Sequence, residues 1–420
     1  MTVRRFDTQT WRASPLSRRG LNLSEFDRER HAVAEICERV RREGDACLRE
    51  LGERFEGWAP GPDESFAVET KQALEQISSA DREALEFAAE RIRAFHSTQR
   101  QEEFVGAGDL GLVTRPVRRA GLYAPGGRAP YPSTVLMTAI PARVAGVDEV
   151  VLATPPRRDG SVAPAILAAA QIAGVDAVYR VGGAQAIAAL AFGTETIPRV
   201  DVVAGPGNIY VALAKREVFG SVGVDGIAGP TEVVVLADAD ARPDFVAADL
   251  AAQLEHDPLA WGVVVTDSSK LADRVEEELE QLVRGLERAE IIRQANCCIV
   301  VARDIEEAID IVEEFAPEHL MVVTYAADRI GLSIRNAGAI FIGPYSTVPL
   351  GDYTAGPNHT LPTSGAARFG SPLGVHTFLK RTSVLSLDGD DLEKLGKATV
   401  RLAGLEGLSA HAHAVEVRLE

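Results

Sequence analysis

The feature that most constrains the fold is a regular alternation of short apolar segments with helical segments after about Leu112. The apolar segments are rich in β-branched residues and too short to be helices, whereas the stretches between them have helical periodicity. Such βαβ repeats predict parallel sheets with helices on their faces. The first series contains the predicted strands Glu149–Ala153, Ala177–Val181 and Val200–Ala204, and the second runs from Glu232–Leu236 to Ala339–Ile342.

The predicted fold class is therefore α/β, with two Rossmann-like parallel-sheet domains, a helical N-terminal section and a small C-terminal segment. Within the N-terminal section, Met1–Leu23 is expected to be an irregular arm, and Ser24 is expected to cap a helix that runs to about Glu43. The predicted parts are residues 1–110 (arm and helices), 111–228 (first α/β domain), 229–345 (second α/β domain) and 346–420 (a loop-rich and helical C-terminal segment).

Charge and cysteine content limit the classes of protein to consider. Asp and Glu number 61 against 44 Lys and Arg, a net charge of −17, which argues against a nucleic-acid-binding face. No uninterrupted apolar run approaches the ~20 residues of a transmembrane helix, and the N-terminus has no apolar core of a secretory signal. The four cysteines form no C-x-x-C motif, so we expect reduced thiols in a cytoplasmic protein.

Three glycine-rich stretches each lie between a predicted strand and a predicted helix. They are Tyr123–Gly127, Gly182–Gln185 and Gly205–Asn208. Ligands of open α/β sheets bind at the carboxyl ends of strands, where helix N-termini attract phosphate. None of the three has the dinucleotide pattern G-x-G-x-x-G. Nucleotide binding and simple tight turns therefore both remain possible interpretations.

Four stretches place a histidine near a carboxylate or amide and could together bind a metal ion. In Ala251–Pro258, Gln253 and His256 are predicted on one face of a helix that ends at Asp257-Pro258. Asp352 is predicted in a loop bounded by Gly351 and Gly356. Imidazole and carboxylate ligands suit Zn²⁺, although a glutamine ligand is unusual. The other three stretches are Pro317–Leu320, Gly351–His359 and Glu406–His411.

Glu318 and His319 precede an apolar predicted strand, where charged residues need an explanation. A Glu–His pair can act as a general acid/base system when burial and neighbouring charges tune it. The alternative is an ordinary surface loop before the strand.

Eight motifs occur in this order along the chain: GLYAPGGRAPYPSTVLM, GGAQAIAALAFGT, AGPGNIYVALAK, AGPTEVVVLAD, AQLEHD, APEHL, GDYTAGPNHTLPT and EGLSAH. Together they closely resemble the histidinol dehydrogenase family, over nearly the whole chain from about Ser24. The resemblance implies oxidation of L-histidinol to L-histidine through L-histidinal, as the last steps of histidine biosynthesis, by a homodimer that uses NAD and one Zn²⁺ per subunit.

The resemblance also implies roles for individual residues. Glu318 and His319 would be the catalytic acid/base pair, and the C-terminal segment would reach into the partner subunit's site. His359 lies in the same stretch as Asp352 without an assigned role. The implied metal ligands are Gln253, His256, Asp352 and His411; the substrate contacts are Thr231, Gln253, His256, His319, Asp352, Glu406 and His411; and the NAD contacts are Tyr123, Gln185 and Asn208.

Three alternatives remain. A relative of the family could oxidise another alcohol, such as a sulfonated diol, although Glu406 and the GGAQAIA motif favour histidinol. A zinc hydrolase could use Glu318 to activate metal-bound water and would form no NADH. A non-catalytic binding protein would tolerate Glu318→Gln.

Overall fold

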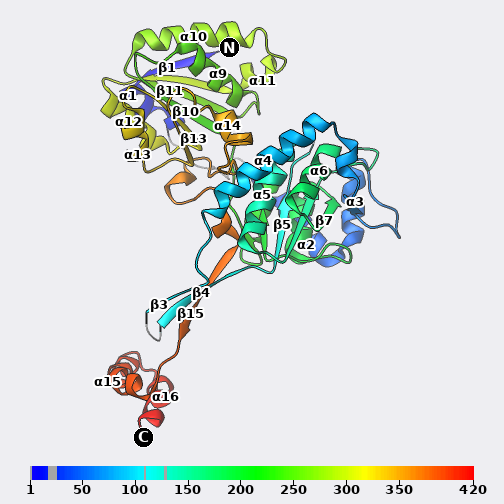
Figure 1. The fold of residues 1–420 in the computed structure, drawn as a ribbon, viewed down its shortest axis with the longest axis vertical. Coiled ribbons are helices and arrows are strands. Elements are labelled where there is room, and N and C mark those ends of the chain that lie inside the picture. The colour runs from blue at the N-terminus through cyan, green and yellow to red at the C-terminus, as the bar shows by residue number, and fades with distance from the viewer. Residues whose placement is uncertain (1, 18–25, 108–109, 127–129) are drawn as a thin grey trace. The chain divides into compact units, whose positions relative to one another are not determined.

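The computed structural model describes residues 2–17, 26–107, 110–126 and 130–420. The chain forms two compact units, whose helices and strands are labelled in Figure 1. The first unit comprises residues 1–100 and 117–378, and the second comprises residues 101–116 and 379–420. The first unit contains two six-stranded sheets built mainly from parallel strands, which confirms the predicted α/β class.

The first sheet has the strand order β2-β7-β6-β5-β8-β9, and every neighbouring pair is parallel except β2 with β7. Its inner strands are buried on both faces, as expected for a parallel sheet covered by helices. The strands are β2 (Ala67–Val68), β5 (Arg119–Tyr123), β6 (Glu149–Thr154), β7 (Ala177–Arg180), β8 (Val202–Ala204) and β9 (Gly223–Val224).

The helices of the first sheet begin with residues suited to helix starts. Pro occupies the first turn of α5 and α6, where a missing N–H costs nothing, and Asn208 caps α8. The helices around this sheet are α2 (Asp27–Glu43), α3 (Asp45–Phe55), α4 (Ser79–Ser97), α5 (Pro132–Ala145), α6 (Pro164–Ala173), α7 (Gly183–Phe192) and α8 (Ile209–Val218).

The second sheet is parallel throughout, in the order β1-β12-β11-β10-β13-β14. Valines dominate its centre, and Val233, Val234 and Val235 are all fully buried. The strands are β1 (Val3–Asp7), β10 (Glu232–Ala237), β11 (Trp261–Thr266), β12 (Asn296–Val301), β13 (His319–Val323) and β14 (Ala339–Ile342); the helices are α1 (Thr8–Ala13), α9 (Pro243–Leu254), α10 (Ser269–Val283), α11 (Ala289–Gln294), α12 (Ile305–Phe315), α13 (Ala327–Ser333) and α14 (Val348–Tyr353).

The N-terminus differs from the expected irregular arm. Val3–Asp7 form β1, which pairs in parallel with Cys297–Val301 of β12. The prediction was wrong here because VRRFD has no strand pattern of its own and is extended by pairing at the sheet edge. The predicted cap Ser24 lies outside the described residues, but α2 does end at Gly44 as expected.

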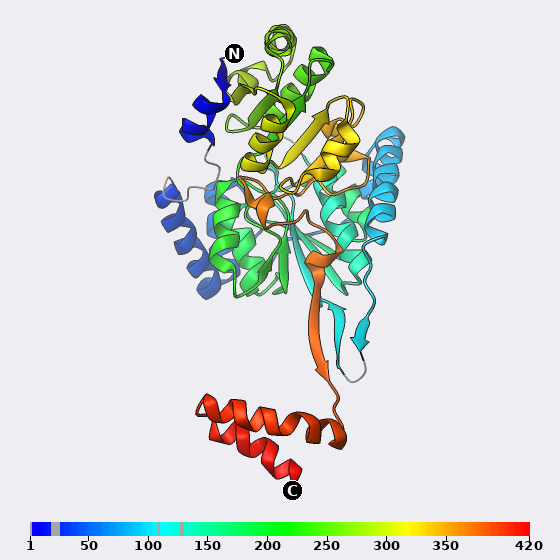
Figure 2. The same ribbon diagram turned by 90° about the vertical axis from the view of Figure 1, so that its left-hand side faces the viewer.

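The second unit combines two segments far apart in the sequence. Strands β3 (Phe104–Ala107), β4 (Leu110–Pro116) and β15 (Leu379–Leu385) form an antiparallel sheet in the order β15-β4-β3. Helices α15 (Gly389–Leu405) and α16 (Ser409–Leu419) follow and lie side by side (Figure 2). The four-part division of the sequence assigned these strands to three different parts; its boundaries stay a prediction.

Among the described residues, we find no helix with the length and apolar character that crossing a membrane requires.

Replacing Trp11 with Ala should markedly destabilise the second sheet. Trp11 is 1% exposed, stacks 6.3 Å from Phe315 and meets Phe6 edge-on at 5.4 Å. Truncating such a buried aromatic side chain costs about 3–5 kcal/mol. The urea midpoint of unfolding should fall, whereas Phe369→Ala, at an 87% exposed position, should leave it nearly unchanged. Equal urea midpoints for wild type and Trp11→Ala would contradict the prediction that Trp11 in the N-terminal segment stabilises the second sheet.

Candidate active site

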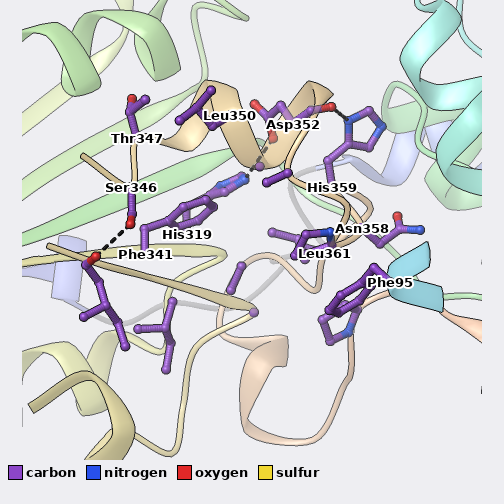
Figure 3. A pocket seen from close by; sticks show the side chains of 18 of the residues that line it. Phe95, His319, Phe341, Ser346, Thr347, Leu350, Asp352, Asn358, His359 and Leu361 are labelled. Carbon is purple, nitrogen blue, oxygen red and sulfur yellow. Dashed lines mark hydrogen bonds and ion pairs between the residues drawn. The ribbon is translucent and has the colours of Figure 1, made fainter. Parts of the chain in front are cut away.

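A cavity of about 650 Å³ lies in the first unit and contains His319, Asp352 and His359 in its wall. His319 is the first residue of β13, and Asp352 belongs to the short helix α14. Figure 3 shows the imidazole of His319 and the carboxylate of Asp352 pointing toward one another, with His319 Nε2 3.6 Å from Asp352 Oδ1. The predicted loop around Asp352 is thus corrected to a helix, in which the side chain is held at the cavity.

Glu318 lies on the other side of the His319 ring. Its Oε2 accepts hydrogen bonds from the Thr231 hydroxyl at 2.6 Å and from the Glu232 backbone N–H at 2.8 Å. The same oxygen is 3.4 Å from His319 Nδ1. Glu318 and His319 are only 6% and 3% exposed, so the pair is not part of a surface loop. The ring of His319 therefore stands between two carboxylates.

The electrostatics of His319 reflect this position. Burial by itself lowers the pKa of the ring, but the carboxylates of Glu318 and Asp352 outweigh it and raise the pKa to about 10. Burial likewise raises the pKa of Asp352, yet His319 and the more distant His359 and His256 hold it below its usual value. The two neighbouring carboxylates thus favour the protonated form of the buried His319 ring.

A chain of hydrogen bonds connects α9 to this pair. The Gln253 side-chain amide donates to Thr231 Oγ1, and Thr231 Oγ1 donates to Glu318. Gln253 is 2% exposed, and its amide oxygen accepts no hydrogen bond from the described residues. That oxygen is a suitable ligand for a cation.

His256 lies beyond the end of the helix that contains Gln253, whereas the sequence predicted a helix that ends at Asp257-Pro258. α9 ends at Leu254, and the His256 N–H makes a long hydrogen bond of 3.4 Å to the Gln253 carbonyl. β11 begins seven residues after the end of α9, at Trp261. His256 nevertheless contributes to the electrostatics of Asp352, so the two side chains share one region.

The donor chemistry suits a zinc ion only in part. Gln253, His256 and Asp352 offer an amide oxygen, an imidazole and a carboxylate, a mixture that zinc accepts. Within the described ranges, no three His, Cys, Asp or Glu side chains gather closely enough to enclose a cation. Glu406, the C-cap of α15, and His411, in α16, belong to the second unit and are exposed.

His359 has a positioning role in this geometry. Its Nδ1 lies 2.9 Å from the Asp352 backbone carbonyl, and its Nε2 lies 3.3 Å from Thr134 Oγ1 of α5. Both ring nitrogens are thus engaged, and burial lowers the pKa of the ring. His359 therefore connects the Asp352 segment to α5, one of the helices of the first sheet.

A second group of predicted residues lies at the carboxyl edge of the first sheet. Tyr123 ends β5, Gln185 is in the first turn of α7 after β7, and Asn208 caps α8 after β8. Between β5 and β8 the strand order reverses direction, and ligands of open α/β sheets bind at such switch points. The Tyr123 hydroxyl accepts the Gly183 N–H at 3.1 Å.

Two supports of this edge were not predicted, although Lys215 is the last residue of the motif AGPGNIYVALAK. Lys215 and Asp225 form a buried ion pair at 2.5 Å, and Lys215 Nζ and Asp225 Oδ2 bond the carbonyl and N–H of Gly205. Glu56 accepts the Gly182 N–H at 2.6 Å. Sequence reasoning missed all three residues because their partners are distant or are backbone groups.

The cysteines contribute nothing to either region. All four are buried, and burial raises the pKa of the Cys297 thiol. An inert thiol in a strand core agrees with the absence of a predicted role.

Comparison with known proteins identifies the family. The sequence model described as histidinol dehydrogenase matches residues 21–419. The chain belongs to the histidinol dehydrogenase family. It is 49% identical to the histidinol dehydrogenase of Parasynechococcus marenigrum over 391 residues, covering 91% of this chain and 90% of that one. For the Prochlorococcus marinus enzyme the identity is 48% over 395 residues, covering 92% and 89%.

A solved structure gives the same result. The histidinol dehydrogenase of Elizabethkingia anophelis superposes with a TM-score of 0.90 at 32% identity, covering 99% of this chain and 98% of that one. As a member of the histidinol dehydrogenase family, the chain is an NAD-dependent dehydrogenase, and the resemblance stated from its motifs is confirmed.

Replacing Asp352 with Asn should lower the pKa of His319, because one of the two carboxylates that raise it becomes neutral. NMR titration of the His319 ring in metal-free protein measures this. Asp249→Asn is the control, since Asp249 bonds Thr347 instead. An unchanged pKa of His319 in Asp352→Asn would contradict the geometry.

The raised pKa of His319 also predicts how the stability of the fold depends on pH. Protonated His319 stabilises the fold below its unfolded pKa of ~6.5, and this contribution is lost as pH rises toward 10.

Proposed function

We propose that the chain catalyses the four-electron oxidation of L-histidinol to L-histidine through L-histidinal, in histidine biosynthesis, with two NAD⁺ as acceptors and one Zn²⁺ per subunit. The single observation that carries this proposal is the position of His319, which is buried in the cavity wall between the carboxylates of Glu318 and Asp352. Family membership supports the substrate. Overall, one water is consumed, two hydrides pass to two NAD⁺, and three protons are released.

In the first step, His319 takes the hydroxyl proton while the alcohol carbon loses a hydride to NAD⁺. This requires a neutral ring, whereas the pKa of about 10 in the metal-free protein favours the protonated form. A divalent cation bound at Asp352 would compensate the negative charge of that carboxylate. The pKa of His319 would then fall toward neutrality. The metal would also hold the amine and imidazole nitrogens of the substrate in place.

In the second step, Glu318 activates the water that adds to the aldehyde, and the hydrate loses a hydride to the second NAD⁺. Glu318 Oε2 is held by Thr231 and the Glu232 N–H, while Oε1 has no hydrogen bond among the described residues and can receive the proton of the water. The hydrogen bonds from Gln253 to Thr231 and from Thr231 to Glu318 would keep this carboxylate oriented toward the substrate.

Gln253, His256, Asp352 and His411 are the proposed zinc ligands. The proposed substrate contacts are Thr231, Gln253, His256, His319, Asp352, Glu406 and His411. Tyr123, Gln185 and Asn208 are the proposed NAD contacts. Their location at the switch point of the first sheet supports this role.

We further propose that the protein is a homodimer in which Glu406 and His411 complete the partner subunit's site. Helices α15 and α16 bury only Gly396 and Ala403 among their described residues. Leu402 and Leu405 are 61% and 72% exposed, and apolar surface of this kind marks a protein interface. The cytoplasm is the proposed compartment.

The stoichiometry of NADH formation tests the reaction. About two NADH per L-histidinol consumed, lost on chelation, is the expected result of a zinc-dependent four-electron oxidation. Release of about one NADH would show that the aldehyde escapes or that another alcohol is the substrate. Metal-dependent hydrolysis of a substrate without any NADH would replace the proposal with the hydrolase alternative.

Zinc content separates the ligands from the acid/base pair. His256→Asn should lose zinc and activity together, because a ligand is removed. His319→Asn should slow turnover by about 10²–10⁴-fold, the usual contribution of a general base, with normal zinc content. Metal analysis of dialysed proteins measures the difference. Loss of zinc from His319→Asn would make His319 a ligand instead.

Mixing two inactive variants tests the shared site. His256→Asn and His411→Asn damage different halves of the proposed metal set. If each site combines both subunits, random exchange gives heterodimers with one intact site, and activity should recover to about a quarter of wild type. Each variant subjected to the same exchange alone is the control. No recovery in demonstrably mixed dimers would place both residues in one subunit's site.

A further inference from the structure

Glu56 follows helix α3 and lies mostly buried against the turn that leads from β7 into α7. Its Oε1 accepts the Gly182 N–H at 2.6 Å and lies 3.4 Å from the Gln185 side-chain nitrogen. Burial raises the pKa of this carboxyl to about 7, although the Gly182 hydrogen bond acts in the opposite direction. A carboxyl kept in such a site normally has a specific task, because burying it is unfavourable unless its hydrogen bonds compensate.

The turn that Glu56 holds is packed too closely for side chains. A Cβ on Gly182 would lie 2.5 Å from Pro155 Cβ and 2.6 Å from Glu56 Oε1. Gly183 has a φ of 62°, in the left-handed region that favours glycine. The two glycines therefore leave room for protein atoms to approach their backbone N–H groups.

These two successive N–H groups point to different acceptors. Gly182 donates to Glu56, and Gly183 donates to the hydroxyl of Tyr123 at 3.1 Å. The amide of Gln185 folds back over the same turn, where its Oε1 would be 2.9 Å from a Cβ on Gly183. Glu56 thus holds the backbone of the turn and one of the side chains that extend from it, next to Tyr123.

We infer that Glu56 is a positioning residue for NAD, which fixes the Gly182–Gly183 turn and the Gln185 side chain against Tyr123. The inference rests on the proposed function, in which Tyr123 and Gln185 contact NAD. Without Glu56, the Gly182 N–H loses its acceptor and Gln185 loses one of its anchors. The cofactor then has to order these groups as it binds, which weakens its affinity.

Glu56→Ala should raise the KM for NAD⁺ about tenfold, the effect of losing one hydrogen bond to a charged group. Both kcat and the KM for L-histidinol should stay within about twofold, since the cavity with His319 is not touched. Glu56→Gln retains a carbonyl oxygen that can accept the Gly182 N–H, and it should recover most of the affinity. Calorimetric titration with NAD⁺ alone provides a second measure that does not depend on turnover.

Glu195→Ala is the matched control. Glu195 Oε2 accepts the Asp45 N–H at 2.7 Å, at the opposite end of the same helix α3. This variant loosens α3 without removing an acceptor from the Gly182–Gly183 turn, and NAD⁺ affinity should be normal. Should Glu56→Ala fail to fold, Glu56→Met fills a similar volume without an acceptor and takes its place.

Normal NAD⁺ affinity in the folded Ala or Met variant would overturn the inference, as would an equal loss in Glu195→Ala. Failure of the proposed function gives a different result. If wild type binds NAD⁺ but does not oxidise L-histidinol, the substrate assignment fails, and the titrations still decide the role of Glu56. Absence of NAD⁺ binding in wild type would overturn both.

Discussion

Parallel pairing of buried strands is the constraint on which both candidate regions depend. When strands run in one direction, all their carboxyl ends meet at one edge, and the loops that follow can bring side chains from distant parts of the sequence together. In the first sheet this edge carries Tyr123, the Gly182–Gly183 turn and Asn208. In the second sheet the candidate residues lie at the amino ends of the strands instead. Glu318 and His319 lie where β13 begins, next to Thr231 where β10 begins.

The polar groups at these edges are stabilised in pairs. Glu318 is held by Thr231 and a backbone N–H, His319 by two carboxylates, and Lys215 by Asp225. Each buried charge has a neighbour that compensates for its lost hydration, as a low-dielectric interior requires. The same arrangement makes the local pKa values sensitive to any charge that enters the cavity.

Much of the fold was predictable because its central strands are apolar runs. Glu149–Ala153 and Glu232–Leu236 were found within a residue of their observed bounds. β5 was expected only as an unbounded strand before the glycine-rich stretch at Tyr123, because RAGLY has neither β-branched residues nor alternation. β1 and β15 were missed because they are charged and because their partners are far away in the sequence: Val3 pairs with Cys297 of β12, and Leu379 pairs with Pro116 of β4. No local pattern encodes such pairing.

The candidate site was predictable to the extent that its residues occur in motifs. The proximity of Asp352 to His319 followed from two such motifs, and the structure brings these side chains together. Glu56 could not be found in this way, since its partner is a backbone N–H of Gly182, 126 residues later. The helix that contains Gln253 was predicted to reach Asp257 but ends at Leu254, because periodicity does not show where a helix stops.

The position of β1 at the edge of the second sheet has a consequence for biosynthesis. Val3–Asp7 leave the ribosome long before their partner strand, Asn296–Val301, is made. During translation this segment, which Trp11 follows in the sequence, has no partner strand until β12 is made. By that time all strands of the first sheet have been synthesised. The second sheet therefore cannot be complete before Asn296–Val301 and the later strands have been made, whereas every strand of the first sheet precedes them in the sequence.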